Sequence, residues 1–215
     1  MIRYDRNYQR LALGLACLSG FVDAIGFMKS GGLFVSFMSG NSTRLAIGLV
    51  EGTRAGLSAA ALICLFVLGV FLSSLVAARL TIAHRKVTGM GSVTALLLCA
   101  AICQSVDWDI PTIGMFCLAM GAANSIFRRN GEVSIGVTYM TGTLVRLGHG
   151  LADAALGGSR NPWAPYLFLW LALVSGGILG TAGYSSFPDA SVWAAFGISF
   201  VLFLITGMLT RDCAV

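Results

Sequence analysis

The stretch Gly31–Leu49, GGLFVSFMSGNSTRLAIGL, decides how this chain is built, because it is too polar for a membrane span and too apolar for a loop. A similar stretch, GVTYMTGTLVRLGHGL, follows at Gly136–Leu151. When residues 35–49 are aligned with residues 137–151, seven of the fifteen positions are identical, and one of these is an arginine. Such a repeat predicts that the fold is built from two similar units, since repeated sequence folds into repeated structure.

The composition predicts an integral membrane protein. Of the 215 residues, 57% are hydrophobic and only 11% are charged, and the mean hydropathy is +0.84. A soluble domain carries about 25% charged residues. The net charge of +5 comes from scattered arginines, which suit loops beside anionic lipid, and no nucleic-acid motif or partner is predicted. The six cysteines have no companions at metal-ligand spacing, so we expect no metal and no other cofactor.

Six stretches are long and apolar enough to cross a bilayer, which takes about 20 helical residues. They are residues 8–28, 56–79, 90–106, 111–128, 163–183 and 190–210. The two repeated segments, 29–51 and 130–153, lie outside this set.

Two topologies follow from the two ways of treating the repeated segments. If each segment enters the membrane and returns to the same side, every basic cluster lies on one side and the loops with Asp107, Asp109 and Asp189 lie on the other. If each segment crosses, giving eight spans, the clusters at 79–86 and 128–129 move to the opposite side. Positively charged loops stay in the cytoplasm, so we favour the re-entrant arrangement, with both termini cytoplasmic.

Each half of the chain then has three spans and one re-entrant segment. Residues 1–107 form the first half and residues 108–215 the second, within one membrane domain. Because three is odd, the second half is inverted relative to the first. Gly20 and Asp23 align with Gly121 and Asn124 in the spans before the repeated segments. Inverted repeats are typical of transporters, whose substrate sites lie where interrupted helices meet near the midplane.

Polar residues in each repeated segment are candidate helix N-caps and candidate substrate contacts. They are Ser39, Gly40 and Asn41 in the first copy, and Thr141, Gly142 and Thr143 in the second. A short helix over 41–50 would begin there, after an extended stretch. The start of a buried helix exposes unpaired N–H groups, and such backbone is tolerated only beside a protein-lined or water-filled cavity.

Charged residues inside the membrane indicate function, because each costs about 2.5–3.5 kcal/mol on insertion scales. Arg44 and Arg146 contact either the substrate or a structural partner. Asp23 is either the ion-pair partner of an arginine or a residue that couples transport to a proton, and Asn124, its neutral counterpart, is a further substrate contact.

His149 is the second candidate for proton coupling. It lies three residues after Arg146 and four before Asp153, so the three side chains can share one helix face. This arrangement is either a proton relay near neutral pH or a structural pair.

The segments SGFVDAIGF, GGLFVSFMSGN and STRLAIGL, which together span residues 19–49 apart from Met28 to Ser30, resemble the YoaK-like family of bacterial membrane proteins. The resemblance covers essentially the whole chain. It implies a multi-span protein of the bacterial inner membrane. The family is known chiefly as one of unknown function, so no substrate, activity or residue role comes with it.

The sequence therefore favours a transporter or channel for a small molecule or ion, with an anionic substrate group. The alternative is a non-transporting scaffold, sensor or assembly partner, although the short loops leave no soluble domain for such a role. An enzyme is not expected, because no acidic pair, serine–histidine arrangement or metal motif is present. Six short spans enclose little space, which favours a homodimer in the lipid bilayer.

Overall fold

The computed structural model describes residues 6–129, 132–133, 136–157 and 162–212, and the described chain is almost entirely helical. The helices are α1 (Arg6–Lys29), α2 (Met38–Glu51), α3 (Arg54–Ala78), α4 (Ile82–Ser105), α5 (Asp109–Ala123), α6 (Met140–Ala155), α7 (Ala164–Ser186) and α8 (Pro188–Asp212). Two strands of two residues each, β1 (Arg128–Arg129) and β2 (Glu132–Val133), pair antiparallel. The all-helical fold predicted from the sequence is confirmed.

The protein is an integral membrane protein. Among the described residues, five helices are long and apolar enough to cross a membrane, with mean hydropathies from 1.6 to 2.6. Their outward-facing side chains are large and apolar, as Leu68 and Leu72 on α3 and Phe200 and Val201 on α8 illustrate. Exposed apolar surface on this scale is rare in soluble monomers and suits contact with lipid tails.

Each of the six predicted spans corresponds to a helix, but the fourth was predicted too long. Residues 111–128 were expected to be helical, whereas α5 ends at Ala123. Ile126 and Phe127 continue the apolar pattern, yet they lie in a turn and are buried in the core. Hydropathy indicates that a residue is buried, whether it lies in a helix or in a turn, and therefore does not show where the helix ends.

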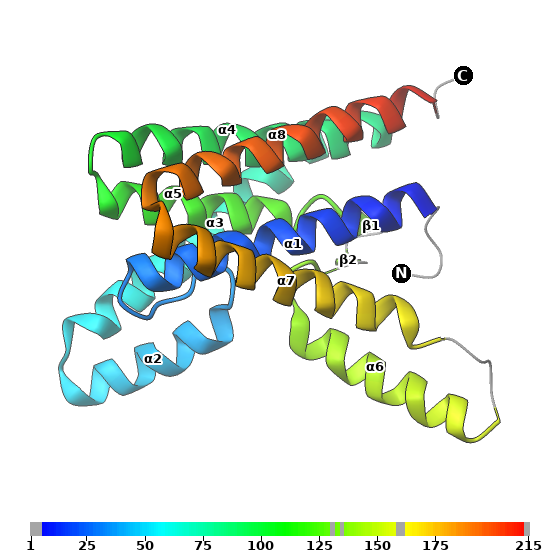
Figure 1. Cartoon of the computed structure of the whole chain (residues 1–215), viewed down its shortest axis with the longest axis horizontal. Helices are drawn as coiled ribbons and strands as arrows, with labels where there is room; N and C mark the ends of the chain where they lie inside the picture. The colour runs from blue at the N-terminus through cyan, green and yellow to red at the C-terminus, as the bar shows by residue number, and fades with distance from the viewer. Residues whose placement is uncertain (1–5, 130–131, 134–135, 158–161, 213–215) are drawn as a thin grey trace.

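The repeated segments return to the end of the bundle from which they entered (Figure 1). Helix α2 has 14 residues and α6 has 16, so they measure about 21 and 24 Å at 1.5 Å per residue, less than the hydrocarbon thickness. Both begin near the middle of the bundle and diverge toward opposite ends, while α1 begins and α8 ends at the same end (Figure 1).

Helices of the first half pack mainly on helices of the second. Helix α1 lies against α7 and α5 lies against α3, while α4 contacts α5 and α8 contacts α1. If α1, α2, α3 and α4 are matched in order with α5, α6, α7 and α8, each of these contacts has an observed counterpart. The contact of α1 with α7 corresponds to that of α5 with α3, and the contact of α4 with α5 corresponds to that of α8 with α1. Helices α4 and α8 also pack on each other, so the two halves are intertwined rather than side by side.

Glycines make the closest of these contacts possible at equivalent places. A Cβ atom on Gly20 of α1 would collide with the carbonyl oxygen of Leu173 in α7. A Cβ atom on Gly121 of α5 would collide in the same way with the carbonyl oxygen of Phe66 in α3. Small residues let membrane helices approach until their backbones touch. The aligned pair Gly20 and Gly121 therefore serves the same crossing in both halves.

A second aligned glycine pair lies in the repeated segments. A Cβ atom on Gly48 of α2 would lie 2.5 Å from the backbone of Gly56 in α3, and a Cβ atom on Gly150 of α6 would lie 3.0–3.1 Å from Trp163, which precedes α7. Each short helix is thereby held close to the full-length helix that follows it.

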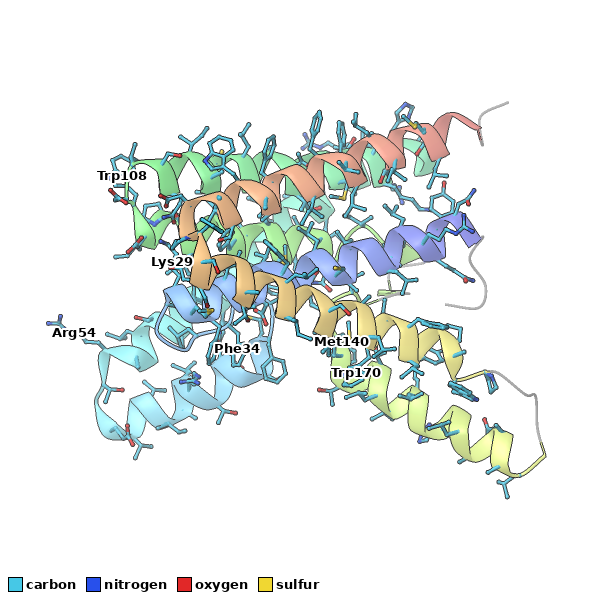
Figure 2. All side chains as sticks on the ribbon, in the orientation of Figure 1. Lys29, Phe34, Arg54, Trp108, Met140 and Trp170 are labelled. Carbon is cyan, nitrogen blue, oxygen red and sulfur yellow. The ribbon has the colours of Figure 1, made fainter. Side chains whose placement is uncertain are left out.

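Lys29 and Asp109 link the end of α1 to the start of α5. The side chains form an ion pair in which the lysine is almost fully buried and the aspartate faces outward. Lys29 is marked in Figure 2 at the end of the bundle that also carries Trp108.

Candidate functional site

The two half-helices begin with the same backbone geometry. Phe37 precedes α2 with φ −89° and ψ 75°, and Tyr139 precedes α6 with φ −88° and ψ 67°. Neither helix has a side-chain N-cap, so the predicted capping by Ser39 to Asn41 and Thr141 to Thr143 is wrong. The backbone carbonyl of Phe37 accepts from the amides of Gly40 and Asn41 instead, and the helix therefore begins three residues before its predicted start.

An aromatic ring folds over each helix start because a glycine leaves room for it. The ring of Phe37 covers Gly40, and the ring of Tyr139 covers Gly142, at distances that a Cβ atom would not allow. This explains why the glycine and the preceding aromatic residue occur together in both copies.

Within the part of the chain that the structure describes, three backbone amides at these helix starts lack an acceptor. Among the described residues, no hydrogen bond is formed by the N–H groups of Ser39, Thr141 and Gly142. Unpaired N–H groups and the positive end of the helix dipole make such a start attractive to an anion.

A cavity of about 920 Å³ lies between the two helix starts. Its walls come from the re-entering loops, from the first turn of α2 and the first two turns of α6, from α3 and α7, and from the two residues that follow α5. The lining residues are Ser36, Phe37, Met38, Ser39, Phe66, Val67, Val70, Phe71, Ser74, Asn124, Ser125, Gly136, Thr138, Tyr139, Met140, Thr141, Gly142, Thr143, Arg146, Tyr166 and Leu169. In Figure 2, Phe34 is labelled in the first re-entering loop and Met140 at the start of α6.

The two repeated arginines occupy different surroundings. The guanidinium carbon of Arg146 lies 5.9 Å from the centre of the Tyr166 ring, and both residues line the cavity. The guanidinium of Arg44 lies 5.8 Å from the ring of Phe27 and 6.0 Å from that of Phe34, outside the cavity. Only Arg146 can therefore contact a molecule bound there.

Asp23 does not pair with an arginine within the described chain, so its predicted role as an ion-pair partner is wrong. Its Oδ1 atom accepts hydrogen bonds from the backbone amides of Val35 at 2.9 Å and Ser36 at 2.7 Å. These amides are buried where the chain re-enters the bundle. The carboxylate is the acceptor that they would otherwise lack, since the loop has no neighbouring strand or helix turn to supply one.

Asn124 holds the second re-entering loop in a related but weaker way. Its Oδ1 atom accepts from the hydroxyl of Thr138 at 3.0 Å, and its Nδ2 atom donates to the carbonyl of Met120 at 2.9 Å. Thr138 aligns with Ser36, so aligned polar residues meet in both halves. The first loop is held by a carboxylate through two amides, and the second by a neutral amide through one hydroxyl.

Asn41 is structural rather than available to a substrate. It is fully buried, its Nδ2 atom donates to the carbonyl of Phe34 at 2.6 Å, and its Oδ1 atom accepts from the amide of Phe34 at 2.9 Å. Thr143, at the aligned position, donates to the carbonyl of Tyr139 at 3.1 Å and also lines the cavity.

Six of the predicted site residues meet at the cavity, and five do not. Those that line it are Ser39, Asn124, Thr141, Gly142, Thr143 and Arg146. Those outside its lining are Asp23, Gly40, Asn41, Arg44 and His149. His149 and Asp153 are both exposed on α6, and within the described chain no hydrogen bond joins them.

The structure adds cavity residues that the sequence did not indicate. The hydroxyls of Ser74 on α3 and Ser125 after α5 lie 3.3 Å apart in the wall. Phe66 of α3 and Tyr166 of α7 add aromatic surface. Hydroxyls within an apolar span were the available signal, but many serines in membrane helices bond only to their own backbone.

A smaller pocket of about 280 Å³ lies at the equivalent place in the other half. Asp23 lines it where Asn124 lines the cavity, and Leu173 of α7 lines it where Phe66 of α3 lines the cavity. The two halves thus differ in how much space they leave beside the re-entering loop. In the described part of the chain, no group of three or more metal-ligating side chains is assembled.

The matches to known proteins extend over nearly the whole chain. Residues 11–205 match the family described as protein of unknown function DUF1275. The chain belongs to this family. It is 35% identical over 195 residues to the UPF0700 transmembrane protein RA0705 of Rhizobium meliloti (strain 1021), covering 90% of this chain and 84% of that protein. No solved structure matches the chain. The resemblance to a multi-span membrane family of unknown function is confirmed, and membership of DUF1275 brings no substrate with it.

Proposed function

We propose that this DUF1275 protein is a transporter or channel, and not an enzyme, that moves a small molecule or ion with an anionic group across the bacterial inner membrane. The observation that carries the proposal is the meeting of two half-helix starts at one cavity with Arg146 in its wall. Irregular backbone within a membrane is tolerated where it is buried in protein or lines a water-filled cavity, and half-helix N-termini commonly receive anionic substrate groups.

An inverted repeat is part of this proposal. The exchange of helix contacts between the halves supports it, and so does the matched use of Gly20 and Gly121. In such proteins, transport follows from rocking or gating of one repeat against the other around a shared site. The larger cavity on one side and the smaller pocket on the other are what one inward- or outward-open state of such a molecule would contain.

The distribution of charge supports cytoplasmic termini. Lys86, near the start of α4, lies 3.2 Å from the ring centre of Tyr8 near the start of α1. The basic cluster of residues 79–86 therefore lies at the end where the chain begins. Asp109 pairs with Lys29 at the other end, where Asp189 also accepts from Gln104 at 2.7 Å. Basic loops remain in the cytoplasm.

A coupling role for Asp23 fits its contacts. A carboxylate accepts the amides of Val35 and Ser36, whereas a protonated carboxyl is a weaker acceptor. Proton binding would therefore release the first re-entering loop, which lines the smaller pocket through Phe34. In this proposal a proton is the coupling ion, and the neutral Asn124 leaves the second half independent of it.

The proposal is tested by a ligand screen followed by uptake. The purified chain is heated with panels of anions, neutral compounds and cations, since a ligand at a hundred times its Kd stabilises the fold by about 2.7 kcal/mol. A stabilising anion is then supplied to proteoliposomes containing the wild type or Arg146→Gln. We expect uptake by the wild type and a loss of at least tenfold in the variant. Binding without uptake by the wild type would reject transport.

A further inference from the structure

The charge in the cavity wall limits the charge of its ligand. Arg146 is the one charged residue among the described lining residues, and no carboxylate is among them. The unpaired amides of Ser39, Thr141 and Gly142 add partial positive charge. A single negative group is matched by this set, whereas a cation would find no counter-charge and a second negative charge would lack a partner.

The shape of the arginine favours a planar anionic group. The Arg146 guanidinium lies over Tyr166, an arrangement that restrains the long side chain while leaving its N–H groups free to donate. A guanidinium matches a carboxylate through two parallel hydrogen bonds, which a lysine cannot reproduce.

The remaining walls favour an apolar body. Phe66, Val67, Val70 and Phe71 form one wall from α3, and Met140 stands on α6. A cavity of about 920 Å³ is far larger than a halide or phosphate needs and lies within the range of organic-ligand sites. An inorganic anion would leave these side chains in contact with water.

From this combination we infer that the cavity binds organic monocarboxylates with an apolar body, of the aromatic or fatty-acid type. The inference rests on the proposed function in that both use the same cavity as the binding site. It does not require transport, because binding can be measured separately. Such a ligand places its carboxylate between Arg146 and the two helix starts, and its apolar part against α3.

The test measures binding to the purified full-length chain by calorimetry. The probes are benzoate, its neutral isostere benzamide, the dianion phthalate, and inorganic phosphate. We expect benzoate to bind, and the three others to bind at least tenfold more weakly. Octanoate represents a fatty acid from the membrane, and benzoate represents an aromatic acid from solution. Comparing their affinities identifies the source of the ligand, and tight binding of either one supports the proposed class.

Two arginine variants form a matched pair for the same probes. Arg146→Gln should weaken benzoate binding at least tenfold, and Arg44→Gln, which removes the aligned arginine outside the cavity, should change it less than twofold. Arg146→Lys keeps the charge without the planar fork and should also bind benzoate more weakly. If Arg146→Gln does not fold, the lysine variant and the comparison of benzoate with benzamide decide the matter.

The inference is overturned if benzamide or phosphate binds as well as benzoate, or if no carboxylate binds the folded wild type. It is also overturned if Arg146→Gln and Arg44→Gln bind benzoate with the same affinity. Uptake of labelled benzoate into proteoliposomes is measured separately. Benzoate that binds through Arg146 but is not taken up leaves this inference standing and rejects only the transport proposal.

Discussion

The carboxylate of Asp23 lies 2.7 Å from the backbone nitrogen of Ser36, across 13 residues of chain, and accepts its hydrogen. The same oxygen accepts the amide of Val35. A side chain from the last two turns of a membrane helix thus supplies the hydrogen-bond acceptor for two backbone amides of the loop that re-enters beside it.

Asp23→Asn is expected to destabilise the protein by about 1–2 kcal/mol, because a neutral acceptor replaces a charged one in two hydrogen bonds. The change makes the first half resemble the second, where Asn124 already stands. Thermal unfolding in detergent measures the effect. Asn124→Asp is the control, and equal stability of wild type and Asp23→Asn would contradict the role of the charge.

Thr141→Cys, in a cysteine-free background, should react with a membrane-impermeant thiol reagent, because Thr141 lines a cavity with unpaired polar groups. Leu72→Cys on α3 is the control, since Leu72 is 48% exposed but on the lipid-facing surface. Labelling is read by the mass of the intact protein. Equal labelling of both positions would contradict the assignment of the cavity to water and of the outer face of α3 to lipid.

Glu51→Cys and Asp153→Cys should be labelled from opposite sides of the membrane. These two residues have the same 102-residue offset as the repeat, and they lie at the outer ends of α2 and α6, which run toward opposite ends of the bundle (Figure 1). The measurement applies an impermeant reagent to intact cells and to inverted vesicles. Labelling of both residues from one side would remove the inverted repeat.

Gly20→Ala and Gly121→Ala should each destabilise the protein by about 1–3 kcal/mol, because the added methyl group overlaps a carbonyl oxygen of the neighbouring helix. Gly197→Ala on α8 is the matched control. Its Cβ atom meets nothing within 4 Å, so the variant should be neutral or up to about 1 kcal/mol more stable. Thermal unfolding compares the three, and similar changes in all of them would exclude backbone contact as the cause.

Much of the candidate site was predictable because the repeated residues serve repeated contacts. The aligned residues Asp23 and Asn124 were recognised as related, and each holds an aligned loop residue, Ser36 or Thr138. The similarity of Arg44 and Arg146, in contrast, concealed that only one of them reaches the cavity. Alignment reports that two positions are equivalent, but not that the two halves have the same conformation.

The sequence by itself determined the membrane class, the helix order and the two interruptions, since hydropathy and glycine placement are local properties. Only the tertiary structure decided where polar groups find their partners. Asp23 bonds to loop amides instead of an arginine, and Asn41 turns back onto Phe34. Such choices depend on which donors the fold brings within about 3 Å of an acceptor, and that distance is decided by the packing of helices from both halves.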